Sequence, residues 1–317
     1  MIHIAALGEV LIDLTQTGTA PDGTRLLAAF PGGAPANVAV AAARLGAEAA
    51  FIGKVGADSF GADLTKVLRD NGVDVAGLYT AGEASTTLAI VTVRDGERSF
   101  SFYRSPGADT LLTAEEALAP LQGQRRPVFL HLGSLSLTAE PIRSATLAAL
   151  EHARASGIFV SYDPNYRAAL WPDAATAVRW MREPLRYAHM VKIADEELPL
   201  LTGESDAALG AEKLAACGPQ LVMVTLGSAG VYYRFGSLTG TVPGCKVAVA
   251  DTNGAGDTFL GAVLSRLATR PAGPFASLDR EELEDCLAYA NRAAALTCSR
   301  SGAIPAMPTK EEVEHGI

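Results

Sequence analysis

Short apolar runs alternate along most of the chain with segments in which apolar residues recur every three or four positions. Runs that are apolar throughout are typical of strands buried on both faces, and the intervening period indicates amphipathic helices. Strands that alternate with helices predict an α/β fold, with a mainly parallel sheet covered by helices on both faces. We expect strands at 4–7, 50–55, 128–132, 158–162, 190–193 and 221–225, and helices at 36–45, 60–71, 140–156, 174–186 and 206–217.

One region departs from this alternation. Residues 86–93 and 98–104 are rich in β-forming residues and are joined across Asp95-Gly96, a dipeptide that favours a hairpin turn. In the second run, polar residues alternate with Phe100 and Phe102, so the two phenylalanines share one face and need a covering surface. The pattern therefore predicts a hairpin that is separate in character from the main sheet.

A small antiparallel sheet beside an α/β domain indicates a lid over a ligand. Residues 9–17 are a further strand that could pair with it, and an edge hairpin of the main sheet is the alternative. We expect a single domain over residues 1–317, with the lid formed from about 9–33 and 84–106. The outer face of such a lid is the expected contact of a homodimer.

Composition and charge narrow the function. Of the 317 residues, 49% are hydrophobic and 19% are charged, and the net charge of −9 argues against a broad surface for nucleic acids or anionic membranes. No apolar run reaches the roughly 18 residues of a membrane span, and the first residues lack the basic segment of a signal peptide. The four cysteines include no Cys-x-x-Cys pair, which argues against a zinc site or a disulfide framework. We therefore expect a cytoplasmic protein with reduced cysteines.

The most informative chemical signal surrounds a glycine-rich turn. A strand-like run at 246–250 enters a turn that contains Gly254 and Gly256, and a helix of small apolar residues is expected from about Ala255. The first turn of such a helix presents unpaired N–H groups that attract an anion, and glycine lets the backbone approach a phosphate. Asp257 in that turn fits a base that takes a proton from a hydroxyl attacking the phosphate. An acid that merely favours the helix start is the alternative.

The same turn carries a family resemblance. Residues 251–259, DTNGAGDTF, resemble the C-terminal signature of the ribokinase-like (PfkB-type) carbohydrate kinases, and residues 32–39, GGAPANVA, resemble their N-terminal signature. The likeness extends over nearly the whole chain, and residues 8–14 and 161–167 are most similar to the fructokinase branch. It implies a three-layer ribokinase-like domain that transfers the γ-phosphoryl group of ATP to a sugar hydroxyl, with fructose as the expected sugar. A 2-keto-3-deoxygluconate kinase, or another sugar or nucleoside kinase of the family, is the alternative.

The resemblance also implies roles in phosphoryl transfer. Asp257 matches the catalytic base, and the N–H groups of Gly254, Ala255 and Gly256 match the anion hole. Other matching positions lie along the expected nucleotide site. The residues implied to contact the nucleotide are Lys192, Thr225, Gly227, Gly230, Gly256 and Asn291.

Two metal ions are implied in the same way. Glu197 matches a glutamate that acts on Mg²⁺ through water, whereas Ala194 stands where the family usually has asparagine, so that side-chain contact is missing. K⁺ beside the anion hole is a further implied cofactor. Its implied ligands are the Asp251 side chain and the carbonyl groups of Asn253, Thr297, Arg300 and Gly302.

The sugar-binding residues combine resemblance with charge. Asp13, Gly33 and Asn37 match the sugar positions of the family, and a carboxylate with an amide can hold neighbouring hydroxyls. An arginine in a cleft of an acidic protein usually binds an anion, and a salt bridge to a nearby acid is the alternative. The residues expected to contact the sugar are Asp13, Gly33, Asn37, Tyr103, Arg104 and Arg167.

Other function classes fit the sequence less well. A Rossmann oxidoreductase needs Gly-x-Gly-x-x-Gly after its first strand, and Gly8-Glu9-Val10-Leu11 does not supply it. The Gly-x-x-x-x-Gly-Lys-[Ser/Thr] motif of P-loop enzymes is also absent from the sequence. A non-catalytic sugar or nucleotide sensor on the kinase fold should have lost Asp257 or its flanking glycines, and both are intact.

Overall fold

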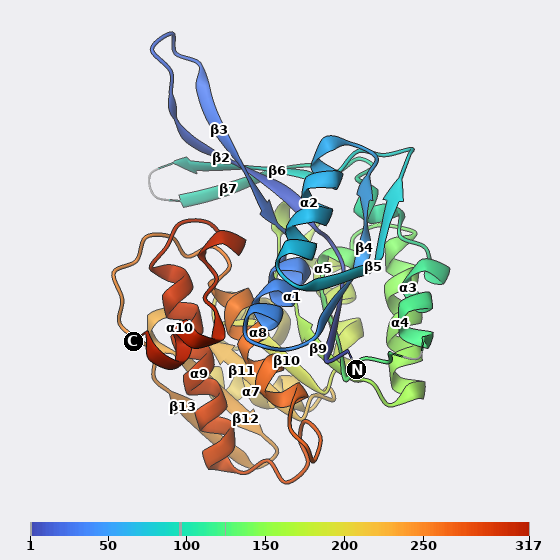
Figure 1. The fold of residues 1–317 in the computed structure, drawn as a ribbon. Helices are drawn as coiled ribbons and strands as arrows, with labels where there is room; N and C mark the ends of the chain where they lie inside the picture. Colours follow the sequence, from blue (N-terminus) through green and yellow to red (C-terminus); the bar gives the residue numbers. More distant parts are fainter. Residues whose placement is uncertain (1, 95–96, 124, 317) are drawn as a thin grey trace.

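The computed structural model describes residues 2–94, 97–123 and 125–316. Its large sheet contains β1 (Ile4–Leu7), β4 (Ala49–Gly56), β5 (Val73–Ala81), β8 (Phe129–Gly133), β9 (Phe159–Asp163), β10 (Met190–Ala194), β11 (Leu221–Thr225), β12 (Val231–Phe235) and β13 (Leu238–Val242). In the described residues their order is β13-β12-β11-β10-β9-β8-β1-β4-β5 (Figure 1). The strands from β11 to β5 run parallel, and β12 and β13 add an antiparallel edge. The mainly parallel sheet expected from the sequence is therefore confirmed.

Helices cover both faces of this sheet. They are α1 (Ala34–Arg44), α2 (Ser59–Asp70), α3 (Ala114–Gln122), α4 (Ile142–Ser156), α5 (Ala174–Arg182), α6 (Leu198–Thr202), α7 (Ala207–Ala215), α8 (Ala255–Ala268), α9 (Arg280–Cys298) and α10 (Lys310–His315). Successive residues of β1 point to opposite faces: Ile4 packs in the core beneath α8 and α9, and Ala5 in the core beneath α4 and α7. The result is the three-layer arrangement that the family resemblance implies.

The small residues of α8 allow it to lie close against α1. A Cβ atom on Gly261 would lie only 2.6 Å from the Cβ atom of Ala41, so the two helices meet backbone to backbone. This contact fixes the start of α8 relative to the start of α1. Across the described ranges, no helix combines the length and the apolar character needed to cross a bilayer.

A second, smaller sheet stands away from the main sheet. It contains β2 (Leu11–Thr19), β3 (Arg25–Gly32), β6 (Leu88–Arg94) and β7 (Glu97–Tyr103), in the order β3-β2-β6-β7 (Figure 1). The β6–β7 hairpin and the strand from the 9–17 region occur as expected, in a sheet of their own rather than at the edge of the large one. Because β2 and β6 run parallel, the sheet is mixed rather than antiparallel throughout. The Asp95-Gly96 turn and the side chain of Phe100 lie outside the described residues.

The strand expected at 246–250 does not form. The edge of the large sheet is occupied by β13, and residues 243–249 have no regular structure. The N–H groups of Ala250 and Asp251 instead donate to the Cys298 carbonyl at the end of α9, at 2.8 and 3.2 Å. Val249 is left 64% exposed. The chain therefore reaches the glycine-rich turn along the end of a helix, not along a strand.

Candidate active site

The parallel strands end at one edge of the sheet, and the residues that follow them surround the candidate site. At this edge Gly133 of β8 pairs with Asp163 of β9, and Ala194 of β10 pairs with Thr225 of β11. Ligands of doubly wound sheets bind outside these carboxyl ends. The polar residues at or just beyond the ends of β1, β8, β9 and β11 are Glu9, Ser134, Asp163 and Thr225.

Asp257 lies in the first turn of α8, as the glycine-rich turn predicts. Gly254 precedes the helix with φ 76°, a left-handed conformation that glycine adopts without strain. Asn37 of α1 donates a hydrogen bond from its Nδ2 atom to Asp257 Oδ2 at 2.8 Å. Burial raises the pKa of Asp257 to about 6, with the Asn37 hydrogen bond and Lys192 lowering it and Asp163 raising it. The carboxyl group is therefore mostly ionised at neutral pH and close to the range that suits proton transfer.

A buried ion pair lies beside this turn. Lys192 Nζ is 2.9 Å from Asp163 Oδ2, and the two side chains are only 8% and 3% exposed. A Cβ atom on Gly256 would lie 2.9 Å from the same Nζ atom, so the ammonium group lies against the first turn of α8. Burial acts to lower the pKa of Lys192, but Asp163, Glu197 and Asp257 outweigh it and the pKa is raised. A charged ammonium group therefore lies next to the N–H groups of the expected anion hole.

Glu197 joins two neighbouring strand ends. One of its carboxylate oxygens accepts a hydrogen bond from the N–H group of Tyr166, and the other accepts from the N–H group of Ala194 at 3.2 Å. Burial and the nearby charge of Asp163 raise the pKa of Glu197, whereas Lys192 and the two N–H groups lower it. Ala194, which has no polar side chain, thus contributes its backbone N–H group to this contact.

Four of the six expected nucleotide residues gather where β11 and β13 end. Gly227 and Gly230 lie in the turn between β11 and β12 with φ values of 55° and 101°. Asn291 of α9 donates from Nδ2 to the carbonyl oxygen of Val242 at 3.1 Å, and a Cβ atom on Gly230 would lie 2.1 Å from that same oxygen. The turn, Asn291 and the chain leaving β13 therefore meet at one point, with Thr225 at the end of β11 leading into the turn.

The residues implied for potassium also come together, although they are far apart in the sequence. Asp251 accepts hydrogen bonds from the N–H group of Asn253 at 2.9 Å and from the N–H group of Gly302 at 3.1 Å. Thr297 is fully buried near the end of α9, and Arg300 follows that helix. Asp251 therefore ties the glycine-rich turn to the chain that follows α9.

At the expected sugar end, three residues surround the start of α1. The Asp13 carboxylate lies over Gly32, where a Cβ atom would be 2.4 Å from Asp13 Oδ2. Gly33 precedes α1 with φ 106°, and a Cβ atom there would be 2.5 Å from the carbonyl oxygen of Glu9. Asn37 follows one turn later and reaches Asp257. Asp13 of the small sheet thus lies beside the turn that leads into α1, and Asn37 connects α1 to α8.

Tyr103 lies on the other face of the small sheet. The register pairs Tyr103 with Leu88, and Leu88 with Ile12, which points to the opposite face from Asp13. Tyr103 is 64% exposed. This placement does not fit the sugar contact expected for Tyr103. The preceding residue, Phe102, points to the Asp13 face instead.

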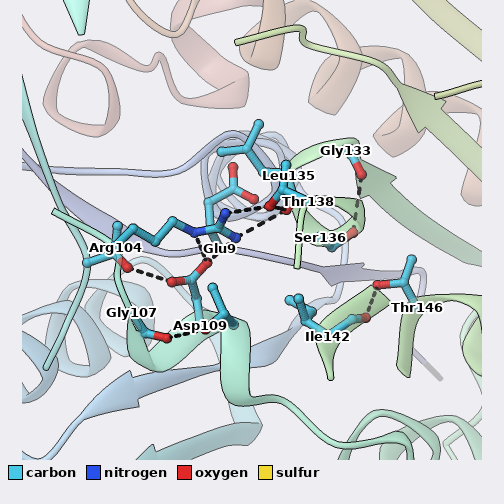
Figure 2. Close-up of polar contacts among 12 residues, drawn as sticks. Glu9, Arg104, Gly107, Asp109, Gly133, Leu135, Ser136, Thr138, Ile142 and Thr146 are labelled. Atoms are coloured by element: carbon cyan, nitrogen blue, oxygen red, sulfur yellow. Dashed lines mark hydrogen bonds and ion pairs between the residues drawn. The ribbon is translucent and has the colours of Figure 1, made fainter. Parts of the chain in front are cut away.

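Arg104 has protein partners for its whole guanidinium group (Figure 2). Its Nε atom donates to Asp109 Oδ2 at 2.7 Å, Nη1 donates to the Thr138 hydroxyl at 2.6 Å, and Nη2 donates to the Leu135 carbonyl at 3.1 Å. The side chain is only 5% exposed. The structure therefore favours the ion pair that the sequence leaves open over the sugar contact expected for Arg104.

Comparison with known proteins decides the family. Residues 1–310 match the model of the pfkB family of carbohydrate kinases. This chain belongs to that family. Fructokinase-1 of Oryza sativa subsp. japonica is 44% identical over 317 residues, which cover 98% of this chain and 96% of the relative.

Solved structures of pfkB family kinases have the same fold. Fructokinase with bound ATP from Xylella fastidiosa has a TM-score of 0.89 and 35% identity, and the match covers 98% of this chain and 97% of that one. A Vibrio cholerae O395 fructokinase in a fructose-, ADP- and calcium-bound form has a TM-score of 0.89 and 33% identity, with 99% and 98% covered. The resemblance stated from the two signatures is therefore confirmed, together with the ribokinase-like fold.

Sequence reasoning about this pfkB kinase overlooked two buried acids, Asp163 and Glu9. Both lie at or just past the carboxyl end of a buried strand, and that position is the signal that could have found them. Among the described residues, four buried side-chain atoms lack a hydrogen-bond partner, and three of them belong to Glu9, Asn37 and Ser134. Buried polar atoms without partners are rare and costly, so their gathering near the start of α1 marks a place for a polar ligand.

Proposed function

We propose that this pfkB family member is an ATP-dependent fructokinase, which transfers the γ-phosphoryl group of ATP to a hydroxyl group of fructose. The observation that carries the proposal is the 2.8 Å hydrogen bond between Asn37 and Asp257. It joins the turn expected to hold the sugar to the helix expected to hold the transferred phosphate, across 220 positions of sequence. The similarity to fructokinases, two of them solved with ATP or with fructose and ADP, supports fructose as the acceptor.

In this proposal Asp257 is the general base. Its carboxylate takes the proton from the sugar hydroxyl as that oxygen bonds to the γ-phosphorus and the bond to the ADP oxygen breaks. The N–H groups of Gly254, Ala255 and Gly256 stabilise the charge of the transferred group, and the Lys192 ammonium adds a positive charge beside them. Asp257 is held for this step by Asn37. Arg167 also acts on it, because the charge of Arg167 lowers the pKa of Asp257.

Magnesium bound to the ATP phosphates is the proposed cofactor. In the part of the chain that the structure describes, no three His, Cys, Asp or Glu side chains form a group that could hold a metal ion. Phosphate oxygens and water therefore supply most of the coordination, which is usual for Mg²⁺. Glu197 is the proposed protein contact, through water, because both of its carboxylate oxygens already accept backbone N–H groups. When bound, the ion neutralises charge on the phosphates.

Potassium is proposed as a second ion, beside the anion hole. Its ligands would be the Asp251 carboxylate and nearby carbonyl groups, with Asp251 holding Asn253 and Gly302 together. A variant of the Vibrio cholerae fructokinase, at 33% identity to this chain, has been solved in a potassium-bound form, which supports the proposal. The remaining proposed carbonyl ligands are those of Thr297 and Arg300.

We further propose that the small sheet is the lid of the sugar site and that it pairs in a cytoplasmic homodimer. Asp13 and Phe102 share the face of the sheet that is expected to cover the sugar. On the opposite face Leu27 is 43% exposed and Tyr103 is 64% exposed, so a second copy would cover apolar surface there. All four cysteines are unpaired, which supports a reducing cytoplasm.

A substrate panel tests the proposed function. Initial rates of ADP release are measured with fructose, 2-keto-3-deoxygluconate, ribose and a nucleoside as acceptors. We expect fructose to give a kcat/KM at least about tenfold above the other acceptors, because hydroxyl-specific sites discriminate strongly. An equal or higher kcat/KM on 2-keto-3-deoxygluconate replaces the sugar and keeps the reaction. No acceptor-dependent release of ADP refutes the kinase itself.

A further inference from the structure

Glu9 is a buried carboxyl group beside residues 32–34, the turn into α1 that the proposed function makes the sugar-binding turn. It follows β1, is only 2% exposed, and accepts a hydrogen bond from the N–H group of Ala34 at 3.0 Å. Ala34 is the first residue of α1, so Glu9 satisfies an N–H group that the helix cannot satisfy itself. The second carboxyl oxygen, Oε2, has no hydrogen-bond partner among the described residues.

The roots of two strands of the small sheet are tied to the main domain beside Glu9 (Figure 2). Arg104 directly follows β7, and Thr87 directly precedes β6. Asp109 binds both: one oxygen accepts from the Thr87 hydroxyl at 2.5 Å and the other from Arg104 Nε at 2.7 Å. Thr138 of the main domain accepts a further hydrogen bond from Arg104 at 2.6 Å. One buried ion pair therefore holds the base of the β6–β7 hairpin.

The charges of this cluster do not balance. Arg104 and Asp109 neutralise each other, and the N-terminal end of α1 is the other positive influence on Glu9. Burial raises the pKa of Glu9 to about 7, whereas the N–H group of Glu9 itself, Arg104 and the Ala34 hydrogen bond lower it and Asp109 raises it. A protonated Glu9 keeps the cluster neutral. An ionised Glu9 adds a second negative charge, which competes with Asp109 for Arg104.

We propose that Glu9 is a positioning residue, which holds the sugar-binding turn in place relative to Asp257 and to the base of the β6–β7 hairpin. The inference rests on the proposed function and adds a residue to it. The connection runs from Glu9 to Ala34, then through α1, where the Asn37 N–H group donates to the Gly33 carbonyl at 2.8 Å. From there the Asn37 side chain reaches Asp257. When Glu9 is neutral, the ion pair between Arg104 and Asp109 is undisturbed. When Glu9 is ionised, it weakens this ion pair, and the start of the β6–β7 hairpin is held less firmly over the sugar.

Two substitutions at Glu9 separate its role as an acceptor from its charge. Glu9→Leu removes the acceptor of Ala34, so the KM for fructose rises about tenfold or more while the KM for ATP stays within about twofold. Glu9→Gln keeps a carbonyl oxygen for Ala34 and returns the KM for fructose to near the wild-type value at pH 6. Glu212→Leu, an exposed glutamate on α7, is the matched control and leaves both constants unchanged.

The pH profile gives a second readout, which a merely structural role would not move. In the wild type, kcat/KM for fructose rises as Asp257 ionises near pH 6 and falls as Glu9 ionises near pH 7. Glu9→Gln keeps the acidic limb and loses the alkaline limb. Should Glu9→Leu not fold, this comparison still decides the question.

Three results overturn the positioning role. The first is a KM for fructose in Glu9→Leu that stays within about twofold of the wild-type value. The second is a wild-type kcat/KM that does not fall near pH 7, and the third is a kcat/KM that still falls there in Glu9→Gln. Failure of the proposed function looks different, because the wild-type enzyme then releases no ADP in response to fructose. In that case the Glu9 variants are compared on whichever acceptor the wild type phosphorylates.

Discussion

Replacing Asp257 with asparagine tests proton transfer with little change in shape. The new amide oxygen can still accept the hydrogen bond from Asn37, which spans 2.8 Å in the wild type, so the contact between α1 and α8 is kept. The variant loses the group that takes the hydroxyl proton. Loss of a general base lowers the rate ~10²–10⁴-fold, which is about 3–5 kcal/mol of activation free energy. Binding of ATP is unchanged or tighter, because a negative charge near Lys192 is removed.

A coupled assay of ADP release across about pH 5 to 9, with calorimetry for ATP binding, measures both parts. Below the Asp257 pKa of about 6, wild-type kcat/KM should fall about tenfold per pH unit, because only the ionised carboxylate accepts a proton. Asp257→Asn should show no such limb. Asp285→Asn, on the exposed side of α9, is the matched control. A variant at Asp257 that keeps more than about a tenth of the wild-type rate, or the same acidic limb, refutes the role of Asp257 as base.

Four further predictions concern Glu9, the buried ion pair of Lys192, the metal and the small sheet. Glu9→Gln should stabilise the fold by about 3 kcal/mol at pH 8 and leave it unchanged at pH 4. The wild-type free energy of unfolding falls as the pH rises from the unfolded pKa of Glu9, 4.5, to its folded pKa of about 7, and glutamine removes this loss. Urea unfolding that shows an equal effect at both pH values contradicts this. Lys192→Met leaves Asp163 buried without its partner and should lower the free energy of unfolding by ~3–5 kcal/mol and also lower kcat. A wild-type melting temperature in scanning calorimetry contradicts this. Chelation with EDTA should stop sugar-dependent release of ADP and added Mg²⁺ should restore it, whereas a rate that survives EDTA argues against the metal. Leu27→Asp should turn a dimer into monomers in sedimentation, and a wild type that is already monomeric at micromolar concentration excludes the proposed homodimer.

Six of the seven parallel strands that the structure describes in the large sheet are predictable because they are mostly apolar on both faces. The seventh, β5, is not among the expected strands, because this edge strand carries polar residues such as Asp74 and Thr80 and is only partly buried. The strands expected at 4–7 and 221–225 coincide with β1 and β11, and the one expected at 128–132 is displaced by a single residue. The same reasoning fails at 246–250, where an apolar run looks like a strand. To pair, this run would have to lie beside the edge strand β13, but the chain passes along the end of α9 instead, where the Cys298 carbonyl accepts from the N–H group of Ala250. The local pattern carries no information about which neighbour is available.

The candidate site likewise contains residues that the sequence predicts and residues that only the tertiary structure places. The glycine-rich turn predicts the place of Asp257 because a helix N-terminus is a local feature with a local signal. Alternation along β7 predicts that Phe102 and Tyr103 face opposite ways, but which of them faces Asp13 depends on the pairing of β2 with β6. The partners of Arg104 come from Asp109 and from residues beyond 134, so tertiary placement decides between a salt bridge and a substrate contact.

The charges around α8 explain how an acidic protein can bind the phosphates of ATP and still keep a base. Asp163, Glu197 and Asp257 lie near Lys192 and Arg167, so the carboxyl groups outnumber the cations around the turn. Lys192 is paired with Asp163, and its ammonium therefore offsets one of these carboxylates before any ligand arrives. Burial raises the pKa of Asp257 toward the range useful for a base, and Asp163 raises it further, whereas Asn37, Lys192 and Arg167 lower it. The surplus of negative charge opposes an anionic ligand, so phosphate binding needs both the N–H groups of the helix and metal ions carried with the nucleotide. The excess of carboxylates around the turn is thus the physical reason for the proposed dependence on a cation.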